Sequence, residues 1–473
     1  MPTKMSNKGR TDLPLTELTA ISILDGRNRT DIQELAPYVS EFNLIRTRFS
    51  IEARYLIALS NTSVLRSLTT KEKQILNNLG ENLTLKSAQQ VKRIEEDTQH
   101  DVKATERSFR SMLHGGSLED ATELVHLGLT SEDINNIAYR LILKGTTNEV
   151  LIPALDDLID NLLDKADKYK GNAMLARTHG QAAVPTTLGK EFAVFATRLN
   201  KEVRALSARE LAGKLTGAVG NLNALETAYP EIDWLNFSEK FINSFGFDAN
   251  LVTTQINPYE DMIAYFQVYQ RINNILTDLV QDMWRYISDG WLVQKAKQGE
   301  VGSSTMPQKV NPIRFENSEG NLGKANALFG YFAEKLGRSR LQRDLSESTV
   351  IRDMGVPLGY SLLSYKNTLK GLSRIKPDLD KISADLNSDW AILSEAAQTL
   401  MRKLRVDDPY SIMATLTQGR HIGETEWKEI VAGLPIPEKE RKKLEELTPE
   451  LYVGYAQSIT NSAIRQIKAS RKK

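Results

Sequence analysis

The stretch YFQVYQRINNILTDLVQDMWRYI, residues 265–287, decides the fold class. Its apolar residues recur every third or fourth position, which is the repeat of an α-helix. The same repeat covers residues 188–206 and 354–372, with Pro357 predicting a bend in the latter, and a further helical pattern begins after Asn311. The sequence therefore predicts several long helices.

Strand-like alternation is scarce in the rest of the chain. Short candidates lie near residues 176–179 and 214–219. Long helical patterns joined by short polar connections predict an extended bundle in the centre of the chain. We therefore expect an all-α protein with an N-terminal helical domain over 1–118, a central bundle over 119–372 and a C-terminal helical domain over 373–473.

The composition excludes several classes of function. The 473 residues include 61 Lys and Arg against 60 Asp and Glu, a net charge of +1, which argues against nucleic acid or an anionic membrane as the main partner. The chain has no cysteine, so disulfides, thiolate nucleophiles and cysteine-bound metals are excluded. The N-terminus lacks the apolar core of a secretory signal, and no run of about 18 apolar residues could span a membrane. We expect a soluble cytoplasmic protein, and nothing in the sequence calls for a metal or an organic cofactor.

Polar side chains with possible chemical roles gather in a few places. Of the five histidines, His100, His126 and His179 lie in unusually polar contexts, although a single histidine is more often structural. Thr130-Ser131 precedes Glu-Asp and can cap the next helix. A helix N-terminus also offers free N–H groups to an anion, so capping and carboxylate binding are compatible.

Residues 299–312, GEVGSSTMPQKVNP, have neither helical nor strand periodicity, although helical patterns lie on both sides. The two glycines permit unusual backbone conformations, and the prolines stiffen the far side. Such a loop could close over a ligand and carry Ser303, Ser304 and Lys309 inward. A surface connection is the alternative, but it would not require this combination of residues.

These stretches resemble a known group of enzymes. The run Gly302–Pro312, together with Thr130-Ser131 and Thr178-His179, resembles the three shared regions of the fumarase/aspartase superfamily. Other stretches are similar to the adenylosuccinate lyase family in its longer bacterial form: Asp25-Gly-Arg27, 177–181, 185–190, 315–323 and 343–352. The resemblance extends from about residue 18 to residue 460 and implies the three-domain helical fold of that superfamily.

The resemblance also implies a reaction. It is the β-elimination of fumarate from adenylosuccinate, giving AMP, and from the succinyl-carboxamide ribotide of purine synthesis (SAICAR), giving AICAR. Ser303 would be the base, with Ser304 as its rival, and His179 would be the acid. Glu316 would orient the imidazole of His179, and His100 would lie beside the base.

The substrate-binding residues that the resemblance implies divide by charge. The succinyl carboxylates would be held by Thr130, Ser131, Gln255, Lys309 and Asn311, and the nucleotide phosphate by Arg27, Arg343, Ser348 and Arg352. The remaining implied binding residues are Asn28, Gln99, Asp101, Ser304, Val310, Asn317 and Thr349. Three positions depart from the family pattern, because Asn28, Gln99 and Gln308 stand where tyrosine, asparagine and histidine are expected. They affect substrate binding more than the type of reaction.

The resemblance further implies a homotetramer in which each active site draws segments from three subunits. The partners expected are nucleotide substrates and copies of the same chain. Argininosuccinate lyase is the nearest alternative, but a phosphate site over 343–352 would serve no purpose there. A non-catalytic protein on the same fold is the alternative from another class, and the retention of Ser303, His179, Lys309 and Glu316 argues against it.

Overall fold

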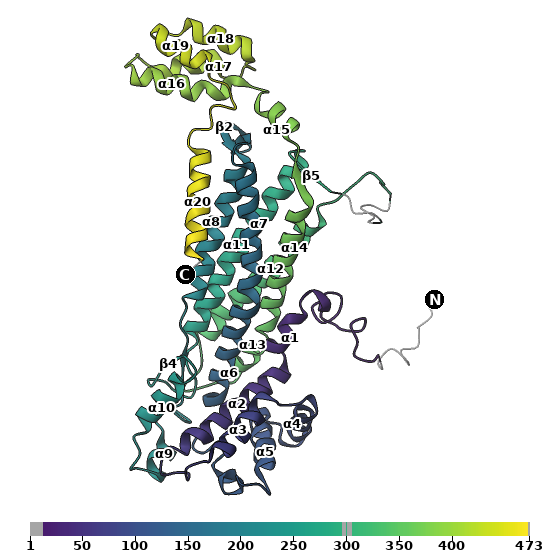
Figure 1. Cartoon of the computed structure of the whole chain (residues 1–473), viewed down its shortest axis with the longest axis vertical. Coiled ribbons are helices and arrows are strands. Elements are labelled where there is room, and N and C mark those ends of the chain that lie inside the picture. Colours follow the sequence, from purple (N-terminus) through teal and green to yellow (C-terminus); the bar gives the residue numbers. More distant parts are fainter. Residues whose placement is uncertain (1–12, 296–298, 300–304, 472–473) are drawn as a thin grey trace. The chain divides into compact units, whose positions relative to one another are not determined.

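The computed structural model of the chain describes residues 13–295, 299 and 305–471, and these residues are mostly helical (Figure 1). The α-helices are α1 (Ala36–Val39), α2 (Glu41–Leu59), α3 (Thr70–Glu81), α4 (Leu85–Thr98), α5 (Asp101–Leu113), α6 (Ser131–Thr146), α7 (Ile152–Tyr169), α8 (Leu188–Ser207), α9 (Asn223–Ala228), α10 (Trp234–Asn243), α11 (Glu260–Ser288), α12 (Ile313–Leu336), α13 (Ser346–Ile351), α14 (Gly355–Arg374), α15 (Leu379–Leu386), α16 (Ser394–Lys403), α17 (Pro409–Thr417), α18 (Glu424–Gly433), α19 (Glu438–Glu445) and α20 (Ala456–Ser470). Short 3₁₀ and π segments are η1 (Arg29–Asp31), η2 (Gln33–Leu35), η3 (Glu119–Leu124), η4 (Thr147–Leu151) and η5 (Trp390–Leu393).

The long helices predicted from periodicity are confirmed as α8, α11, α12 and α14. In α11 the apolar positions of the repeat are buried from Tyr265 to Met283, as expected for an amphipathic helix. The bend predicted at Pro357 is wrong, because α14 begins at Gly355 and the proline lies in its first turn. A proline there removes no helical hydrogen bond.

The described residues form three two-stranded sheets. β1 (Ala173–Thr178) pairs antiparallel with β2 (Gln181–Thr187), and β5 (Leu292–Gln294) pairs antiparallel with β6 (Ile375–Pro377). β3 (Ala212–Gly213) and β4 (Asp248–Ala249) form a short parallel pair. The strand predicted near 176–179 is confirmed as part of β1, whereas the one predicted over 214–219 is wrong, since that segment is an irregular loop.

The chain divides into two units by the density of internal contacts. Unit 1 comprises residues 1–154, 203–274 and 320–366, and unit 2 comprises 155–202, 275–319 and 367–473. The division of the sequence into three consecutive domains stays a prediction.

Unit 1 has an aromatic core where α11 meets α12. Phe266 and Tyr269 both stack on Phe329, with ring centroids 5.6 Å apart in each pair. Tyr269 also shares a hydrogen bond of 2.7 Å with the hydroxyl of Thr147. These contacts fix the position of the N-terminal half of α11, which follows the loop that carries Gln255.

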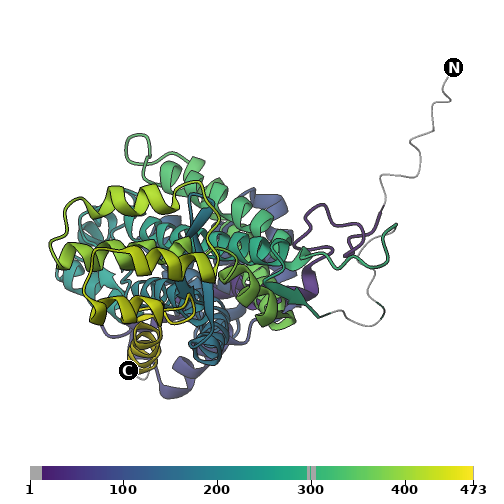
Figure 2. The same cartoon turned by 90° about the horizontal axis from the view of Figure 1, so that it is seen from above.

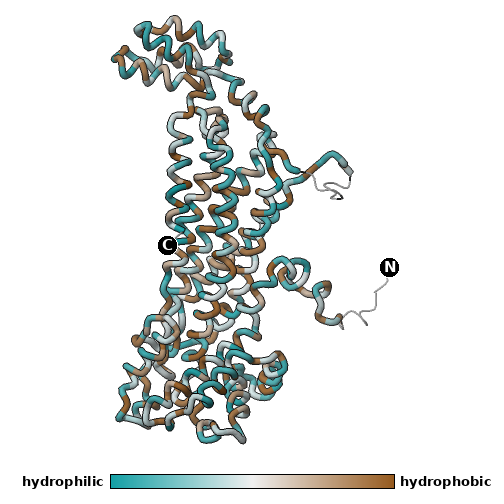
Figure 3. The backbone as a smooth tube through the Cα atoms, in the orientation of Figure 1, coloured by the Kyte–Doolittle hydropathy of each residue, from teal (hydrophilic) through white to brown (hydrophobic). Residues whose placement is uncertain are grey.

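In unit 2, the helices α16 to α19 enclose their own apolar cluster around Trp427, which is fully buried. Figure 2 shows these helices side by side, and brown apolar positions recur along them in Figure 3. The following helix α20 returns to α7 and α8, where Ser470 Oγ accepts a hydrogen bond of 3.2 Å from Asn200 Nδ2 and Arg471 pairs with Asp156 at 3.2 Å.

Within the ranges that the structure describes, none of the helices has the length and apolar character needed to cross a membrane.

Candidate functional site

The N-terminus of α6 carries two predicted carboxylate ligands, Thr130 and Ser131. Thr130 is the N-cap: its N–H donates to Asp133 Oδ2 at 2.8 Å, and its carbonyl accepts from the Asp133 N–H at 2.9 Å. The predicted capping of this helix is therefore confirmed. Thr130 and Ser131 are both half-buried, next to the N–H groups that the first helical turn leaves unbonded. This arrangement is chemically suited to a carboxylate.

A buried ion pair fixes the loop after β3. Lys214 Nζ lies 2.6 Å from Asp133 Oδ1, and neither side chain is exposed. The same oxygen accepts the backbone N–H groups of Thr216 at 3.0 Å and Gly217 at 3.3 Å. Lys214 Nζ also donates to the Gly217 carbonyl at 2.9 Å. Because side chains take the groups that a β-ladder would use, the strand predicted here does not form.

Arg343, a predicted phosphate ligand, lies beside Gln255, a predicted carboxylate ligand. Its Nη1 donates to Gln255 Oε1 at 3.1 Å, and Gln255 Nε2 donates to the Ala218 carbonyl at 2.9 Å. Two buried carboxylates face the same guanidinium: Glu347 Oε1 accepts from Nε at 3.0 Å, and Glu132 Oε2 lies 3.7 Å from Nη2. The structure therefore brings these two predicted ligands together.

Asp101 forms an ion pair with a second predicted phosphate ligand, Arg352. Asp101 Oδ2 accepts from Arg352 Nη2 and from Arg48 Nη2, each at 2.6 Å. Arg352 Nε also donates to Ser348 Oγ at 3.4 Å, so three predicted binding residues meet. Burial opposes the ionisation of Asp101, but the two guanidiniums outweigh it and hold the pKa of this carboxyl well below its usual range. Two cations on one carboxylate leave this group with a net positive charge.

His100 is the N-cap of α5, immediately before Asp101. Its Nδ1 accepts a hydrogen bond of 3.2 Å from the Lys103 N–H, and about half of its side chain is exposed, at 52%. Its neighbour Gln99 has a left-handed backbone, with φ of 50°, and donates from Nε2 to the Glu96 carbonyl at 2.7 Å. Gln99, a departure from the family pattern, therefore closes the C-terminus of α4.

The other predicted ligands of unit 1 lie at the surface or close to it. Arg27 and Thr349 are exposed, and Asn28 is half-buried, with its N–H donating to the Ile23 carbonyl at 2.9 Å. Thr349 lies on α13 next to Ser348. The structure leaves the predicted roles of Arg27, Asn28 and Thr349 as predictions.

His179 stands at the tip of the hairpin formed by β1 and β2. Thr178 pairs with Gln181, so His179 and Gly180 are the two turn residues, with φ of 52° and 74°. Positive φ at both positions is the requirement of a type I′ turn, which matches the twist of the strands. Histidine pays a steric cost there that glycine and asparagine largely avoid. An exposed imidazole at a strained turn is a candidate for function.

The loop 299–312 is described from Thr305 onward, apart from Gly299. Ser303 and Ser304, the candidate bases, lie outside the described residues. The Lys309 N–H donates to the Met306 carbonyl at 3.1 Å, and the Val310 carbonyl accepts from Gln294 Nε2 at 2.9 Å. The side chain of Lys309 is exposed.

The end of this loop leads into α12. Asn311 is half-buried, and Glu316 and Asn317 are exposed in the first turns of the helix. Glu316 Oε1 accepts from Trp284 Nε1 at 3.2 Å. Between these two described residues, His179 and Glu316, no hydrogen bond or ion pair forms within one chain, so their predicted pairing stays a prediction.

Several residues of the site escaped prediction. Arg48 is buried and pairs with Asp101 across 53 positions, and nothing in its own neighbourhood in the sequence indicates this. Glu132 and Glu347 lie inside stretches that the sequence singled out, 130–136 and 343–352. Their carboxylates were interpretable only as helix-dipole partners or surface charges, since their shared contact with Arg343 is not visible locally.

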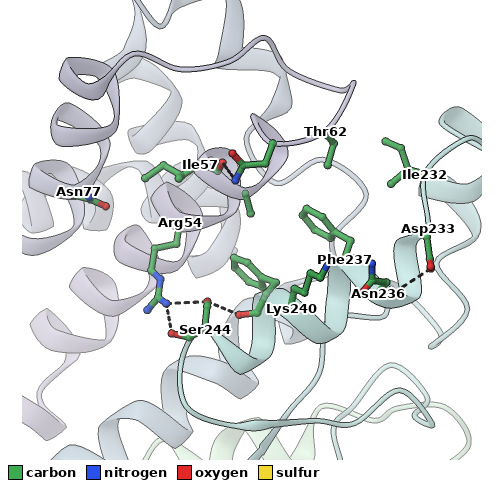
Figure 4. A pocket seen from close by; sticks show the side chains of 13 residues that line it. Arg54, Ile57, Thr62, Asn77, Ile232, Asp233, Asn236, Phe237, Lys240 and Ser244 are labelled. Atoms are coloured by element: carbon green, nitrogen blue, oxygen red, sulfur yellow. Dashed lines mark hydrogen bonds between the residues drawn. The ribbon is translucent and has the colours of Figure 1, made fainter.

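A cavity of about 640 Å³ in unit 1 contains none of the predicted site residues (Figure 4). It lies between α2 and α10, and Phe237 and Lys240 line it (Figure 4). Its Arg54 donates to Ser244 Oγ at 2.9 Å and stacks on the Phe245 ring at 3.6 Å. Ser244 is the C-cap of α10, so Arg54 serves to close that helix.

Known families match most of the chain. The family described as "Lyase" matches residues 37–327, and the family described as "Adenylosuccinate lyase C-terminal" matches residues 339–453. Among known structures, the chain is similar to a 3-carboxy-cis,cis-muconate lactonizing enzyme from Pseudomonas putida, with a TM-score of 0.72 and 17% identity over 92% of this chain and 97% of that one. A fumarate lyase from a Mesorhizobium species gives a TM-score of 0.72 and 16% identity over the same shares. These likenesses confirm the predicted helical fold of the superfamily.

Curated relatives are much closer in sequence. The adenylosuccinate lyase of Haemophilus influenzae is 41% identical over 94% of this chain and 98% of its own. The enzymes of Escherichia coli and Dictyostelium discoideum are 41% and 42% identical over the same shares. The predicted relationship is therefore confirmed, and the chain belongs to the adenylosuccinate lyase family of C–N lyases within the fumarase/aspartase superfamily.

Proposed function

We propose that the chain eliminates fumarate from adenylosuccinate, giving AMP, and from SAICAR, giving AICAR. The observation that carries this proposal is the match of residues 339–453 to the C-terminal family of adenylosuccinate lyases. That region includes Arg343, Ser348 and Arg352, the residues suited to a nucleotide phosphate. A phosphate site favours a nucleotide substrate over argininosuccinate.

The elimination needs a base, an acid and donors for a carboxylate. Ser303 would remove the carbon-bound proton next to the carboxylate, with Ser304 as the alternative base. A serine hydroxyl ionises far above neutral pH, so it requires positive potential, which Lys309 and backbone N–H groups of a closed loop would supply. His179 would protonate the departing nitrogen, and its exposure on a hairpin makes it accessible to a substrate.

The two ends of the substrate would be held by different groups. Thr130, Ser131 and Gln255, with Lys309 and Asn311, would bind the succinyl carboxylates. The phosphate would meet Arg352 in the net positive group that also includes Arg48 and Asp101. Because a phosphate dianion is attracted to that charge, this end is a reasonable anchor for the nucleotide.

We further propose a homotetramer with shared active sites, located in the cytoplasm. The support is that His179, Lys309 and Glu316 are exposed in unit 2, while the predicted phosphate ligands belong to unit 1. Each active site would then combine the residues of unit 1 in one chain with the residues of unit 2 in a neighbouring chain. Long helices with apolar faces are compatible with such an assembly.

Fumarate release provides the direct test of the reaction. Purified protein is expected to release fumarate from adenylosuccinate and from SAICAR and to leave argininosuccinate unchanged. The release is measured by the absorbance of fumarate. Turnover of argininosuccinate alone would favour the alternative lyase. Inertness toward all three would favour a non-catalytic protein on the same fold.

Mixed oligomers test the sharing of active sites. His179→Asn and Arg352→Ala are each expected to be inactive, and co-refolding the two variants should restore measurable turnover. If each site takes His179 from one chain and Arg352 from another, some sites of a mixed oligomer contain both residues intact. Wild-type chains taken through the same procedure are the control. Failure of the mixture when the control recovers, or full activity of an isolated monomer, would contradict shared sites.

A further inference from the structure

Two buried carboxylates compete for one guanidinium at the junction of α6 and α13. Glu132 and Glu347 are each 1% exposed, and Arg343 lies between them. Glu347 Oε1 accepts the Nε hydrogen at 3.0 Å, whereas Glu132 Oε2 lies 3.7 Å from Nη2, beyond hydrogen-bond length. Arg343 is therefore firmly held along one edge and loosely held at the other.

The charge at this junction is not balanced. Besides Arg343 and Glu347, the charged or titratable groups that face Glu132 are Arg140, Lys214, Tyr139 and Tyr259. Arg140 forms two hydrogen bonds with Asp261, at 2.7 and 2.8 Å, and Lys214 is paired with Asp133. Both cations are thus already neutralised, and one guanidinium is left for two carboxylates. A buried group with a net charge of −1 is costly and repels an anion.

Two features indicate which of the two carboxylates can lose its contact with Arg343. Glu347 Oε2 is buried and has no hydrogen-bond partner among the residues that the structure describes, so this carboxylate relies on the bond that Oε1 accepts from Arg343. Glu132 Oε1 retains the Tyr259 hydroxyl as a donor at 3.3 Å. Burial raises the pKa of Glu132 to about 7, with Arg343 opposing the rise and Glu347 adding to it. Glu132 can therefore take up a proton near neutral pH.

We propose that Glu132 and Glu347 are positioning residues for Arg343: Glu347 aims the guanidinium, and Glu132 releases it and takes up a proton when a substrate phosphate arrives. The inference rests on the proposed function, because it takes Arg343 as a phosphate ligand. The proton comes from solvent, and no covalent bond other than the O–H bond is made. Gln255, which also accepts from Arg343, links this exchange to the end of the substrate that carries the succinyl group.

The sign of the pH dependence follows from this exchange. As pH rises through about 7, Glu132 becomes ionised and competes with the phosphate for Arg343. The affinity for a phosphate-bearing ligand should therefore fall with rising pH, relative to a variant that lacks the carboxylate. A neutral ligand without phosphate should show no such dependence.

The test compares AMP with adenosine in titration calorimetry on the full-length wild type and on Glu132→Gln. The ratio of the wild-type Kd to the variant Kd for AMP should rise about tenfold between about pH 6 and pH 8.5, the order expected for a carboxylate charge that competes with the phosphate for one guanidinium. Taking the ratio cancels the titration of AMP itself. For adenosine the ratio should stay flat, and a flat ratio for AMP would overturn the proposal.

Glu347→Gln provides a second, distinguishing variant. Removing this charge lowers the proton affinity of Glu132, so the pH midpoint of the AMP affinity should move to lower pH. A merely structural role for Glu347 would weaken binding without moving the midpoint. Glu424→Gln, on the exposed surface of α18, is the matched control and should leave the profile unchanged.

A wild-type measurement keeps the proposal testable if Glu132→Gln does not fold. Near pH 8, where the phosphate of AMP is already a dianion, AMP binding in buffers of different ionisation enthalpy should take up a substantial fraction of one proton. Binding without proton uptake would overturn the inference while leaving the proposed reaction intact. A wild type that neither binds AMP nor releases fumarate would instead contradict the proposed function.

Discussion

Replacing His179 with asparagine is expected to lower kcat for fumarate release by about 10²- to 10⁴-fold, the contribution of a positioned acid. Asparagine is favoured where φ is positive in a type I′ turn, so the β1–β2 hairpin should keep its shape. Its amide carries no proton that it can donate near neutral pH. The melting temperature should therefore stay unchanged or rise while turnover is lost. Steady-state kinetics and thermal unfolding of the same preparation measure both effects.

Two further variants separate chemistry from folding at this turn. His179→Ala should also abolish turnover, but with a loss of stability of about 1 kcal/mol, because alanine resists the left-handed conformation. His421→Asn changes another exposed histidine and should alter neither property. Near-normal turnover in His179→Asn would remove His179 from the proposed role of acid.

Replacing Asp133 with alanine is expected to lower the free energy of unfolding by about 3–5 kcal/mol, the usual cost of breaking a buried ion pair. The change leaves the Lys214 ammonium buried without its counterion, and the N–H groups of Thr216 and Gly217 lose their acceptor. The loop that precedes Ala218, the carbonyl partner of Gln255, should loosen with them. Urea unfolding followed by circular dichroism measures the loss.

Matched variants test whether burial is the cause. Lys428 and Glu424 form an ion pair of the same length, 2.6 Å, with side chains 50% and 58% exposed. Lys428→Ala should cost no more than about 0.5 kcal/mol, because solvent screens an exposed pair. Lys214→Met should be less harmful than Asp133→Ala, since Asp133 keeps its three backbone donors, the N–H groups of Thr130, Thr216 and Gly217. Equal effects of Asp133→Ala and Lys428→Ala would show that the buried pair does not hold the loop.

The helices were predictable because their signal is local. The apolar repeat over 265–287 needs only the period of the helix and a core to pack against, and it makes up most of α11. The strand expected over 214–219 failed for the opposite reason. The N–H groups of Thr216 and Gly217 bond to Asp133, more than 80 positions earlier in the chain, and no local pattern could indicate that partner.

The candidate site divides in the same way. The residue types suited to proton transfer and anion binding were evident from short motifs, such as Thr178-His179 and the stretch 343–352. Their pairings were not evident, because Arg48 meets Asp101 across 53 positions and Gln255 meets Arg343 across 88. The turn conformation that exposes His179 also emerged only with the pairing of β1 and β2.

By itself, the amino-acid sequence determined that this protein is helical, which family it resembles and which side chains are available for chemistry. Only the tertiary structure decided which charges neutralise one another, with Asp101 shared between two arginines and Arg343 shared between two buried carboxylates. The physical reason is that periodicity and capping act within a few turns of chain. The charge state of a buried group depends instead on neighbours that packing brings from distant segments.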